Sequence, residues 1–517
     1  MDKDKVPIEE AINRAGFGLY SYLMIGLAGI AIISFACIGY GSTILVPASA
    51  CELNTTAAQQ GVLAAGPVVG SIIGVVIWGY LADTRGRRSM LLVALLGGSL
   101  INSIASISVN WIMLLIMQFC ASLFASGLYS MSMSLLSESV PIVRRNLVVL
   151  LVTSIFMLSQ GLMAVLAIPV IPLSFSIYLP ALGIYWNSWR TLVIVYSLPG
   201  FITAMWLFFM KESPKFVYSQ GDEHQALEIL KTIHRINNCC SSVKELEVNS
   251  ILKEEVKMTE LGTVETQQSP IKQLFSRPHL KYTIIMTLLL MFQQVGAFLV
   301  WLPTVANQFV NIVQTGDGSD LGLCSIIRLS LDTPADPDEV PCSLNLIAML
   351  MVFGVGAMQS LVNLCLSLIV NYTGRRNIVF GLTSICGVAG ILVNLVPNAI
   401  GSAILFAVML QGIIVLGMYT AIIVAIFPTQ LRALAIAIPL MGGRMVTFAT
   451  IQILNIMLIN SCEAGFYLFA TIYASSAIVA AFLPDDRQLK PPSAASVAPP
   501  PDSEKKHKEL YRNVSQL

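Results

Sequence analysis

Long apolar runs, separated by short polar segments, are the dominant pattern along this chain. Each run approaches the roughly 20 residues that a helix needs to cross the hydrocarbon core of a bilayer. The apolar positions do not alternate with a period of two, so they predict helices and not the strands of a membrane barrel. Twelve runs are candidate spans: 21–46, 60–81, 90–109, 111–136, 147–171, 190–210, 282–303, 345–370, 378–396, 402–426, 434–459 and 466–483.

A repeated loop divides these spans into two groups of six. The loop 79–88 (GYLADTRGRR) joins spans two and three, and 367–376 (SLIVNYTGRR) joins spans eight and nine. In both, Gly follows an Asp or Asn by three residues and precedes two Arg. Many secondary transporters are built from such internal repeats around a central site. We therefore predict an all-α membrane protein with two pseudo-symmetric six-helix bundles.

The polar segments complete the predicted domain organisation. Within the linker, Ala226, Ile229, Leu230 and Ile233 recur at helical spacing, which predicts an amphipathic helix over 223–236. The tail is rich in Pro, Ser and Ala before a charged end, and we expect it to be disordered. The five segments are an N-terminus 1–20, a first bundle 21–210, a linker 211–281, a second bundle 282–483 and a tail 484–517.

Composition and charge placement support a membrane protein with both termini in the cytosol. Apolar residues make up 56% of the chain and charged residues only 11%, whereas about a quarter of a soluble globular protein is charged. With the N-terminus in the cytosol, all but three of the 30 Lys and Arg fall on the cytosolic side, the exceptions being Arg190, Arg328 and Arg444. This asymmetry follows the positive-inside rule. The net charge of +1 gives no support for a nucleic-acid partner.

The opposite side carries two candidate modification sites. Cys324 and Cys342 share one polar loop, and we leave open whether they form a disulfide or stay as free thiols. Asn54 begins the sequence Asn-Thr-Thr, an acceptor for an N-linked glycan. The ten Cys show no metal-ligand spacing, and we expect neither a metal nor a cofactor.

Several motifs together resemble the major facilitator superfamily over about residues 8–490. The loop 79–88 is similar to the superfamily's loop between spans two and three, and 212–216 (ESPKF) resembles the sugar-porter signature after span six. The segments 8–18 and 47–53 are similar to synaptic vesicle glycoprotein 2-related and organic-ion-transporter-like members. The resemblance implies two bundles that expose a central site to each side of the membrane in turn.

Two departures from that branch bear on energy coupling. Span one lacks the acidic residues that the branch often has, since 34–38 reads SFACI. Gln118 stands where span four usually carries Arg. Both losses argue against proton coupling of the usual kind and favour facilitated transport or exchange.

Charged residues at the cytosolic ends of the spans are candidates for a gate. An Asp or Glu opposite Arg can form charge-assisted bonds between neighbouring helices, and in the superfamily such contacts hold the cytosolic side shut. The alternative is that these Arg only fix orientation, and both interpretations stay open. The candidate gate residues are Asp83, Arg87, Arg88, Glu138, Arg144, Arg145, Arg375 and Arg376.

One ionisable residue and a set of amides are candidates for a solute cavity. Arg444 is the single ionisable residue in the core of a predicted span, which favours a solute with a carboxylate or sulfate. Its alternatives are a structural contact with a helix end or loop acid, or packing at Gly442 and Gly443. The neutral candidates could line a polar cavity or simply hydrogen-bond between helices. They are Gln160, Gln293, Gln294, Gln359, Asn363, Gln411, Tyr419, Gln452 and Asn455.

We expect a secondary-active or facilitative carrier that moves a small organic solute, either an organic ion or a polar metabolite, by alternating access. It would act as a monomer in contact with membrane lipid, in the plasma membrane or a vesicle membrane. The alternative is a membrane regulator or scaffold that transports nothing. No catalytic set of nucleophile, base and orienting residue is found at suitable spacing, so we predict no enzyme activity.

Overall fold

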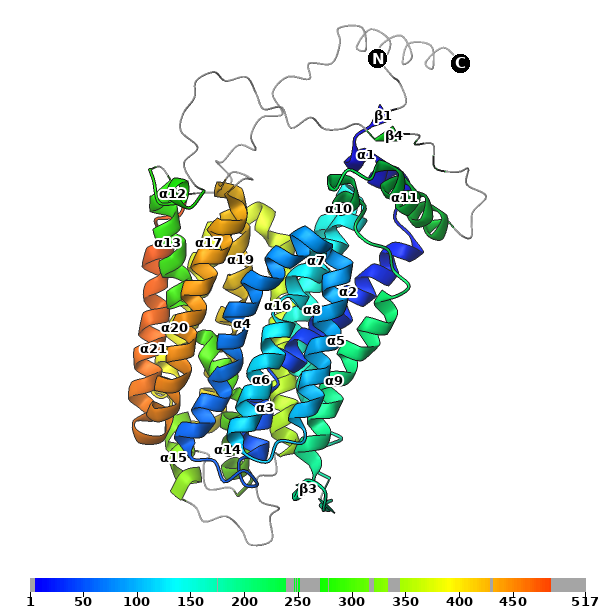
Figure 1. Ribbon diagram of the computed structural model, residues 1–517. Helices are drawn as coiled ribbons and strands as arrows, with labels where there is room; N and C mark the ends of the chain where they lie inside the picture. The colour runs from blue at the N-terminus through cyan, green and yellow to red at the C-terminus, as the bar shows by residue number, and fades with distance from the viewer. Residues whose placement is uncertain are drawn as a thin grey trace, which may run out of the picture.

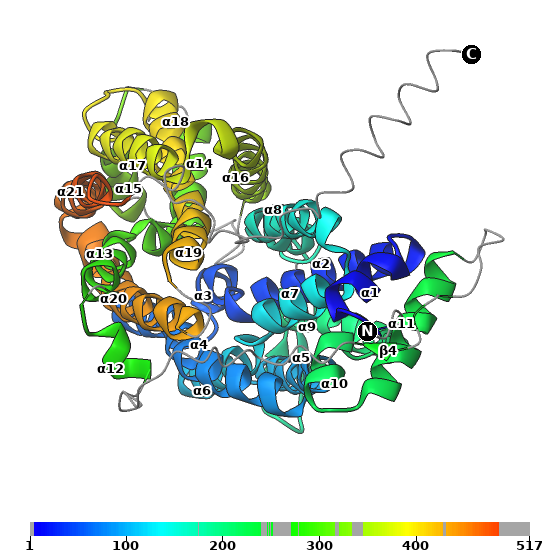
Figure 2. The same cartoon turned by 90° about the horizontal axis from the view of Figure 1, so that it is seen from above.

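The computed structural model describes residues 5–173, 175–238, 246, 248, 250–251, 270–277, 279–315, 320–332, 345–427 and 431–484. Long, roughly parallel helices form two bundles that lie side by side (Figures 1 and 2). We call the first bundle the N-half and the second the C-half. The end of the molecule with α1, α10, α11 and α12 is called the terminal end, and the end with α3, α15 and the strand β3 is called the hairpin end (Figure 1).

The N-half contains the first six predicted spans. Two of these spans are each made of two consecutive helices, α2 with α3 and α6 with α7. The N-half helices are α2 (Leu19–Gly39), α3 (Ser42–Ser49), α4 (Ala57–Arg85), α5 (Arg87–Ala105), α6 (Trp111–Ala125), α7 (Leu128–Ser139), α8 (Ile142–Ala167) and α9 (Ser188–Leu207).

The C-half contains the other six. One span is α13 with α14, and another is broken by the 3₁₀ segment η1. The C-half helices are α13 (His279–Phe292), α14 (Val295–Thr315), α15 (Leu323–Asp332), α16 (Leu346–Thr373), α17 (Arg375–Leu392), α18 (Ala399–Leu410), η1 (Gln411–Ile414), α19 (Val415–Ile426), α20 (Arg432–Asn460) and α21 (Cys462–Ala480).

The helices coincide with the twelve predicted spans. In the described part of the chain, eleven helical stretches are long and apolar enough to cross a membrane. The remaining predicted span is α17, which has 18 residues and begins with Arg375 and Arg376, so its mean hydropathy is reduced at one end. The short helix α15 lies in a segment that the sequence predicts only as a polar loop.

Small elements cover the terminal end of the N-half. They are β1 (Lys5–Val6), α1 (Ile8–Ala15), α10 (Pro214–Ser219), α11 (Glu223–Asn237) and β4 (Ser250–Ile251), with α12 (Pro270–Leu274) beside the C-half. The strands β1 and β4 pair in parallel, with Lys5 opposite Ser250 and Val6 opposite Ile251. The two strands are thus adjacent in space although they are far apart in the sequence. The helix α11 occupies the stretch whose spacing predicts an amphipathic helix, and its four apolar residues are buried.

The buried apolar side chains divide differently at the two ends. Toward the hairpin end, one continuous cluster contains residues of both halves, such as Leu63 and Trp189 with Phe298 and Phe466. Toward the terminal end there are two clusters, one confined to the N-half and the elements that cover it, the other confined to the C-half. The two halves therefore share a core at the hairpin end and have separate cores at the terminal end.

The cysteine pairing differs from the sequence prediction. Cys324, at the start of α15, forms a disulfide with Cys462, at the start of α21, across 138 residues. The suggested Cys324–Cys342 pair is therefore wrong, and Cys342 lies outside the described residues. The reason is that helix packing, not loop membership, brings the two helix starts to a Cα–Cα distance of 5.6 Å. Cys51 is also disulfide-bonded.

Candidate functional site

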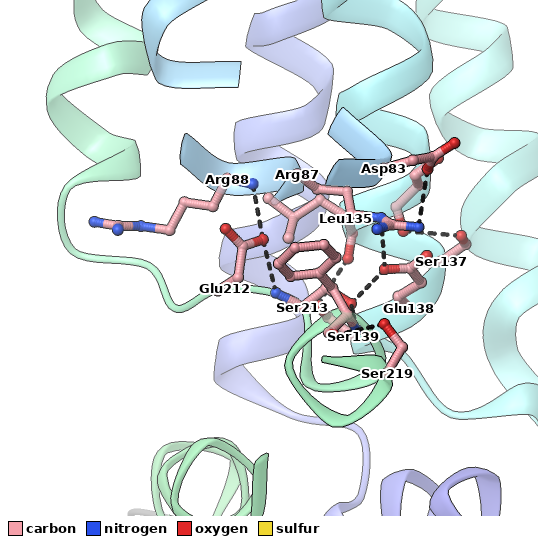
Figure 3. A network of polar contacts seen from close by, with 12 residues as sticks. Asp83, Arg87, Arg88, Leu135, Ser137, Glu138, Ser139, Glu212, Ser213 and Ser219 are labelled. Atoms are coloured by element: carbon pink, nitrogen blue, oxygen red, sulfur yellow. Dashed lines mark hydrogen bonds and ion pairs between the residues drawn. The ribbon is translucent and has the colours of Figure 1, made fainter. Parts of the chain in front are cut away.

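Arg87 lies at the centre of a charge network at the terminal end of the N-half (Figure 3). Its guanidinium is 3.4 Å from the carboxylate of Glu138, and both side chains are 18% exposed. It is also 3.2 Å from Asp83, one turn earlier, whose side chain is 75% exposed. Ser213 donates a hydrogen bond to Glu138, and Phe216 stacks against Arg87 at 5.1 Å. The half-buried Arg87–Glu138 pair is thus better shielded from water than the pair with Asp83.

Glu212 caps the start of α5 from a distant part of the chain. Its carboxylate accepts hydrogen bonds from the backbone N–H groups of Arg88, at 2.8 Å, and Ser89, at 3.3 Å. A carboxylate at a helix N-terminus satisfies free donors and complements the helix dipole. Position 86, just before α5, requires a glycine: the φ of Gly86 is +100°, and a Cβ there would lie 2.6 Å from the Glu212 carboxylate. The Arg88 guanidinium points away from Glu212 to carbonyls at the end of α9 (Figure 3).

Glu9 connects the N-terminal helix α1 to the N-half. Its carboxylate accepts from Arg145 at 3.0 Å and from Lys215. Burial raises the pKa of Glu9, but the hydrogen bonds from Lys215 and Arg145 outweigh burial and hold that pKa below its ordinary range. Arg144, the neighbouring gate candidate, is exposed.

The gate candidates of the C-half contact carbonyls. Arg375 donates to the carbonyl of Ala421 at 3.5 Å, and Arg376 to that of Ala481 at 2.7 Å. Gly374 has a φ of +80°, so the repeated loop has the same left-handed glycine in both halves. The two copies of the loop therefore share a backbone conformation at this glycine.

Four of the cavity candidates link the two halves. Each donates a hydrogen bond from one half to the other, at the middle of the spans or nearer the hairpin end. They are Gln160 to the Leu299 carbonyl (2.8 Å), Asn363 to Ser154 Oγ (3.3 Å), Arg444 to the carbonyl and Oγ of Ser71 (3.2 and 3.3 Å) and Asn455 to the Ala57 carbonyl (2.6 Å).

Arg444 lies near the middle of α20 and is partly buried. Within the described residues it has no acidic partner, because its contacts in the structure are the two oxygens of Ser71. Of the alternatives considered for Arg444, a contact with a loop acid is not found among the described residues. A guanidinium has five N–H donors, so the contact with Ser71 leaves donors for another group.

Four of the other candidates hydrogen-bond within the C-half. Gln293 donates to the carbonyl of Gly412 at 2.7 Å, and Gln359 to that of Leu410 at 3.1 Å, both at the 3₁₀ break in the span. Gln294, between α13 and α14, donates to the carbonyl of Met291 near the end of α13. Gln411, at the start of η1, donates to the carbonyl of Ala407 in α18 at 3.0 Å. Two further candidates follow: Tyr419 is fully buried in the C-half, and Gln452 lies against Gly61 of α4.

A buried ion pair at the hairpin end was not among the sequence candidates. Arg190 is 1% exposed and lies 2.6 Å from Glu52. It also donates to the carbonyls of Ser106 and Ser108 at 2.7 and 2.9 Å, while Glu52 accepts from Trp189 at 2.6 Å. The sequence signal was present, since Arg190 is one of three basic residues that break the charge rule. Asn54, the glycan candidate, is exposed on the same end and has a φ of +48°.

Comparisons with known proteins agree with this architecture. The sequence matches the family described as Major Facilitator Superfamily over residues 16–330. It is 23% identical over 324 residues to the synaptic vesicle 2-related protein of Bos taurus, covering 62% of this chain and 52% of that protein. It is 25% identical over 230 residues to synaptic vesicle glycoprotein 2B of Homo sapiens, covering 44% and 34% respectively. The chain thus spans about half the length, or less, of these curated relatives.

A solved transporter structure has the same fold as this chain over almost the whole length of both proteins. The partially occluded inward-open conformation of the xylose transporter XylE from E. coli superposes with a TM-score of 0.63. The two chains are 16% identical, and the alignment covers 90% of this chain and 99% of that one. This likeness confirms the predicted architecture of two six-helix bundles.

Proposed function

This chain belongs to the Major Facilitator Superfamily, and from that premise we propose that it carries a small organic solute across a membrane by alternating access. It does so as a secondary-active or facilitative carrier, with the solute held between the N-half and the C-half. The terminal end faces the cytosol, in keeping with the placement near that end of all the described Lys and Arg except Arg190, Arg328 and Arg444. The carrier works as a monomer in a plasma or vesicle membrane.

The main support for this proposal is the way the buried apolar clusters divide between the two ends of the molecule. A shared cluster at the hairpin end and separate clusters at the terminal end are what a carrier needs when it is closed on one side and open on the other. To open the hairpin end, the four side-chain links between the halves must break. At roughly 0.6 kcal/mol for each interhelical hydrogen bond in a membrane, the set costs about 2–3 kcal/mol. A ligand can shift a two-state equilibrium of that size.

Arg444 is our candidate for the group that recognises the solute. In the conformation described, it joins the two halves through Ser71 and retains free donors. A carboxylate or sulfate would accept two parallel N–H bonds from the guanidinium. Gln160 and Asn363 lie on the facing helices α8 and α16 and supply amides for uncharged polar groups of the solute.

The charge network at the terminal end is our candidate for the cytosolic gate. Asp83, Arg87 and Glu138 are held together by α4, α5 and α7 of the N-half, so the network moves with that half. Because α4 packs against α20 of the C-half, closure of the terminal end would bring the network toward that half. Exposed pairs contribute at most about 1 kcal/mol, so the gate requires several of these residues together.

Uptake into proteoliposomes tests the proposal. A panel of small carboxylates, sulfates and neutral polyols should include at least one solute that accumulates in the vesicles. Arg444→Gln should reduce uptake of the anions by at least tenfold. A loss of about 1.4 kcal/mol in binding free energy corresponds to that factor of ten. Ser71→Ala is the matched control, because it removes a hydroxyl partner and keeps the carbonyl and the Arg. If folded protein moves no member of the panel, the carrier proposal fails and the regulator interpretation is favoured.

A further inference from the structure

The segment between α8 and α9 folds into a short β-hairpin at the hairpin end. Strands β2 (Ile177–Leu179) and β3 (Ile184–Trp186) pair antiparallel, with Tyr178 opposite Tyr185. The turn is closed by N–H groups of Leu182 and Gly183, which donate to the Leu179 carbonyl at 3.2 and 3.0 Å. Gly183 has a φ of +65°, the left-handed conformation that follows a type I turn in such hairpins.

One face of the hairpin is apolar, aromatic and exposed. The rings of Tyr178 and Tyr185 lie 5.1 Å apart and point away from the bundle, whereas Ile184 on the other face is buried. The exposed apolar side chains of this segment are Leu173 (48%), Ile177 (59%), Tyr178 (52%), Leu182 (44%) and Tyr185 (54%).

The hairpin and its flanks contain no charge. The connection between α8 and α9, residues 168–187, includes no Asp, Glu, Lys, Arg or His. A loop in water would be expected to carry charges at about one position in four. An exposed, uncharged and aromatic surface of this kind is suited to an apolar or interfacial environment rather than to bulk water.

The helix that follows fixes the level of the hairpin relative to a bilayer. With 20 residues and a rise of about 1.5 Å per residue, α9 is about 30 Å long, the thickness of the hydrocarbon core. The hairpin directly precedes α9 and extends beyond its end (Figure 1). It therefore lies at the level of the lipid headgroups, where Tyr and Trp are enriched because one end of the ring is apolar and the other polar.

The buried ion pair holds the hairpin in this position. Arg190 donates through Nε to the carbonyl of Tyr185 at 3.0 Å, and Trp186 donates to Thr191 at 3.0 Å. Because Arg190 is itself fixed by Glu52 of the neighbouring loop, the aromatic face is presented by a rigid support.

We propose that the β2–β3 hairpin is a membrane-interface anchor: its Tyr178–Tyr185 face inserts among the phospholipid headgroups at the hairpin end. This contact is independent of the solute. It fixes the depth and tilt of the N-half in the bilayer while the C-half moves against it.

Fluorescence quenching tests the anchor. Tyr178→Cys and Leu182→Cys are each labelled with the environment-sensitive dye NBD in detergent and reconstituted into phosphatidylcholine vesicles. The emission should shift to shorter wavelength and be quenched by phosphatidylcholine brominated near the headgroup, with little quenching by aqueous iodide. Both positions are exposed, so neither substitution leaves a cavity in the core of the bundle.

Asn54→Cys is the control, because Asn54 is exposed in a polar turn at the same end. Its label should be quenched by iodide and not by brominated lipid. Unmodified protein gives the background from free cysteines such as the exposed Cys365, whereas Cys51, Cys324 and Cys462 do not react because they form disulfides. Equal iodide quenching at positions 178 and 54 would overturn the proposal. So would labels that are open to water in vesicles but shielded in native membranes, which would indicate a protein partner.

Discussion

Replacing Gln160 with Leu should make the carrier open more often at the hairpin end. In the structure Gln160 Nε2 donates to the Leu299 carbonyl at 2.8 Å and so joins α8 to α14. Leu has a similar volume but no hydrogen-bond donor. The substitution therefore removes the bond between Gln160 and Leu299 from the conformation in which the halves touch, and it leaves the open conformation unaffected. An interhelical hydrogen bond of about 0.6 kcal/mol corresponds to a roughly threefold change in the equilibrium between the two conformations, since RT is about 0.59 kcal/mol.

Pulsed electron spin resonance measures this equilibrium directly. Nitroxide amino acids placed at Asn54 and Asn460 report the distance between the halves at the hairpin end, because both residues are exposed there. In Gln160→Leu the population at long distance should rise about threefold over unsubstituted protein, without added solute. Gln411→Leu is the matched control, because Gln411 bonds to the carbonyl of Ala407 in its own span.

Two results would refute this reasoning. The first is an unchanged distance distribution in Gln160→Leu, which would mean that the bond is replaced by water or by another partner. The second is an equal shift in Gln411→Leu, which would mean that any loss of a buried amide loosens the bundle, whichever helices it joins. A larger effect, up to about 1.7 kcal/mol, lies within the range observed for such bonds in membranes.

Three further predictions concern stability, each measured by thermal unfolding in detergent. Glu52→Ala should lower the free energy of unfolding by about 3–5 kcal/mol, because it leaves the buried Arg190 without its acidic partner. An unchanged midpoint of thermal unfolding would contradict a stabilising role for the ion pair. Glu9→Gln should destabilise the protein at neutral pH. Since the pKa of Glu9 is lowered in the folded protein, its contribution to the free energy of unfolding is full at neutral pH and is lost as the pH falls. The difference in unfolding temperature between Glu9→Gln and the unsubstituted protein should therefore narrow below pH 4.5. A difference that stays constant with pH would contradict this prediction. Cys324→Ser and Cys462→Ser should each cost about 2–5 kcal/mol, with no further loss in the double variant, and additive losses would argue against the pairing.

The spans were predictable from the sequence because the signal is local. A run of about 20 apolar residues has few structural solutions in a bilayer, and the described helices coincide with the predicted runs. The helix α11 was predictable for the same reason, since its spacing shows which face is buried. The resemblance to synaptic vesicle glycoprotein 2-related members is also confirmed, as is the superfamily.

Pairings between distant residues were not predictable in this way. The Cys324–Cys462 disulfide depends on how α15 packs beside α21, which no local pattern encodes. The Glu52–Arg190 pair, which joins the turn after α3 to the start of α9, depends on packing for the same reason. The hairpin left a local signal, because Leu179-Pro-Ala-Leu-Gly183 has Pro and Gly where a tight turn needs them. The roles of the cavity and gate residues stay predictions.

The small elements at the terminal end are fastened to the N-half. Asn237, at the end of α11, accepts from the backbone N–H of Tyr20 and donates to the carbonyl of Gly16, and Glu9 binds Arg145 at the start of α8. Among the described residues after span six, α11 is thus bound to the N-half and is expected to move with it. A tag or cytosolic protein bound to α11 would therefore change position in each transport cycle, so α11 is a place from which the cycle can be monitored or slowed.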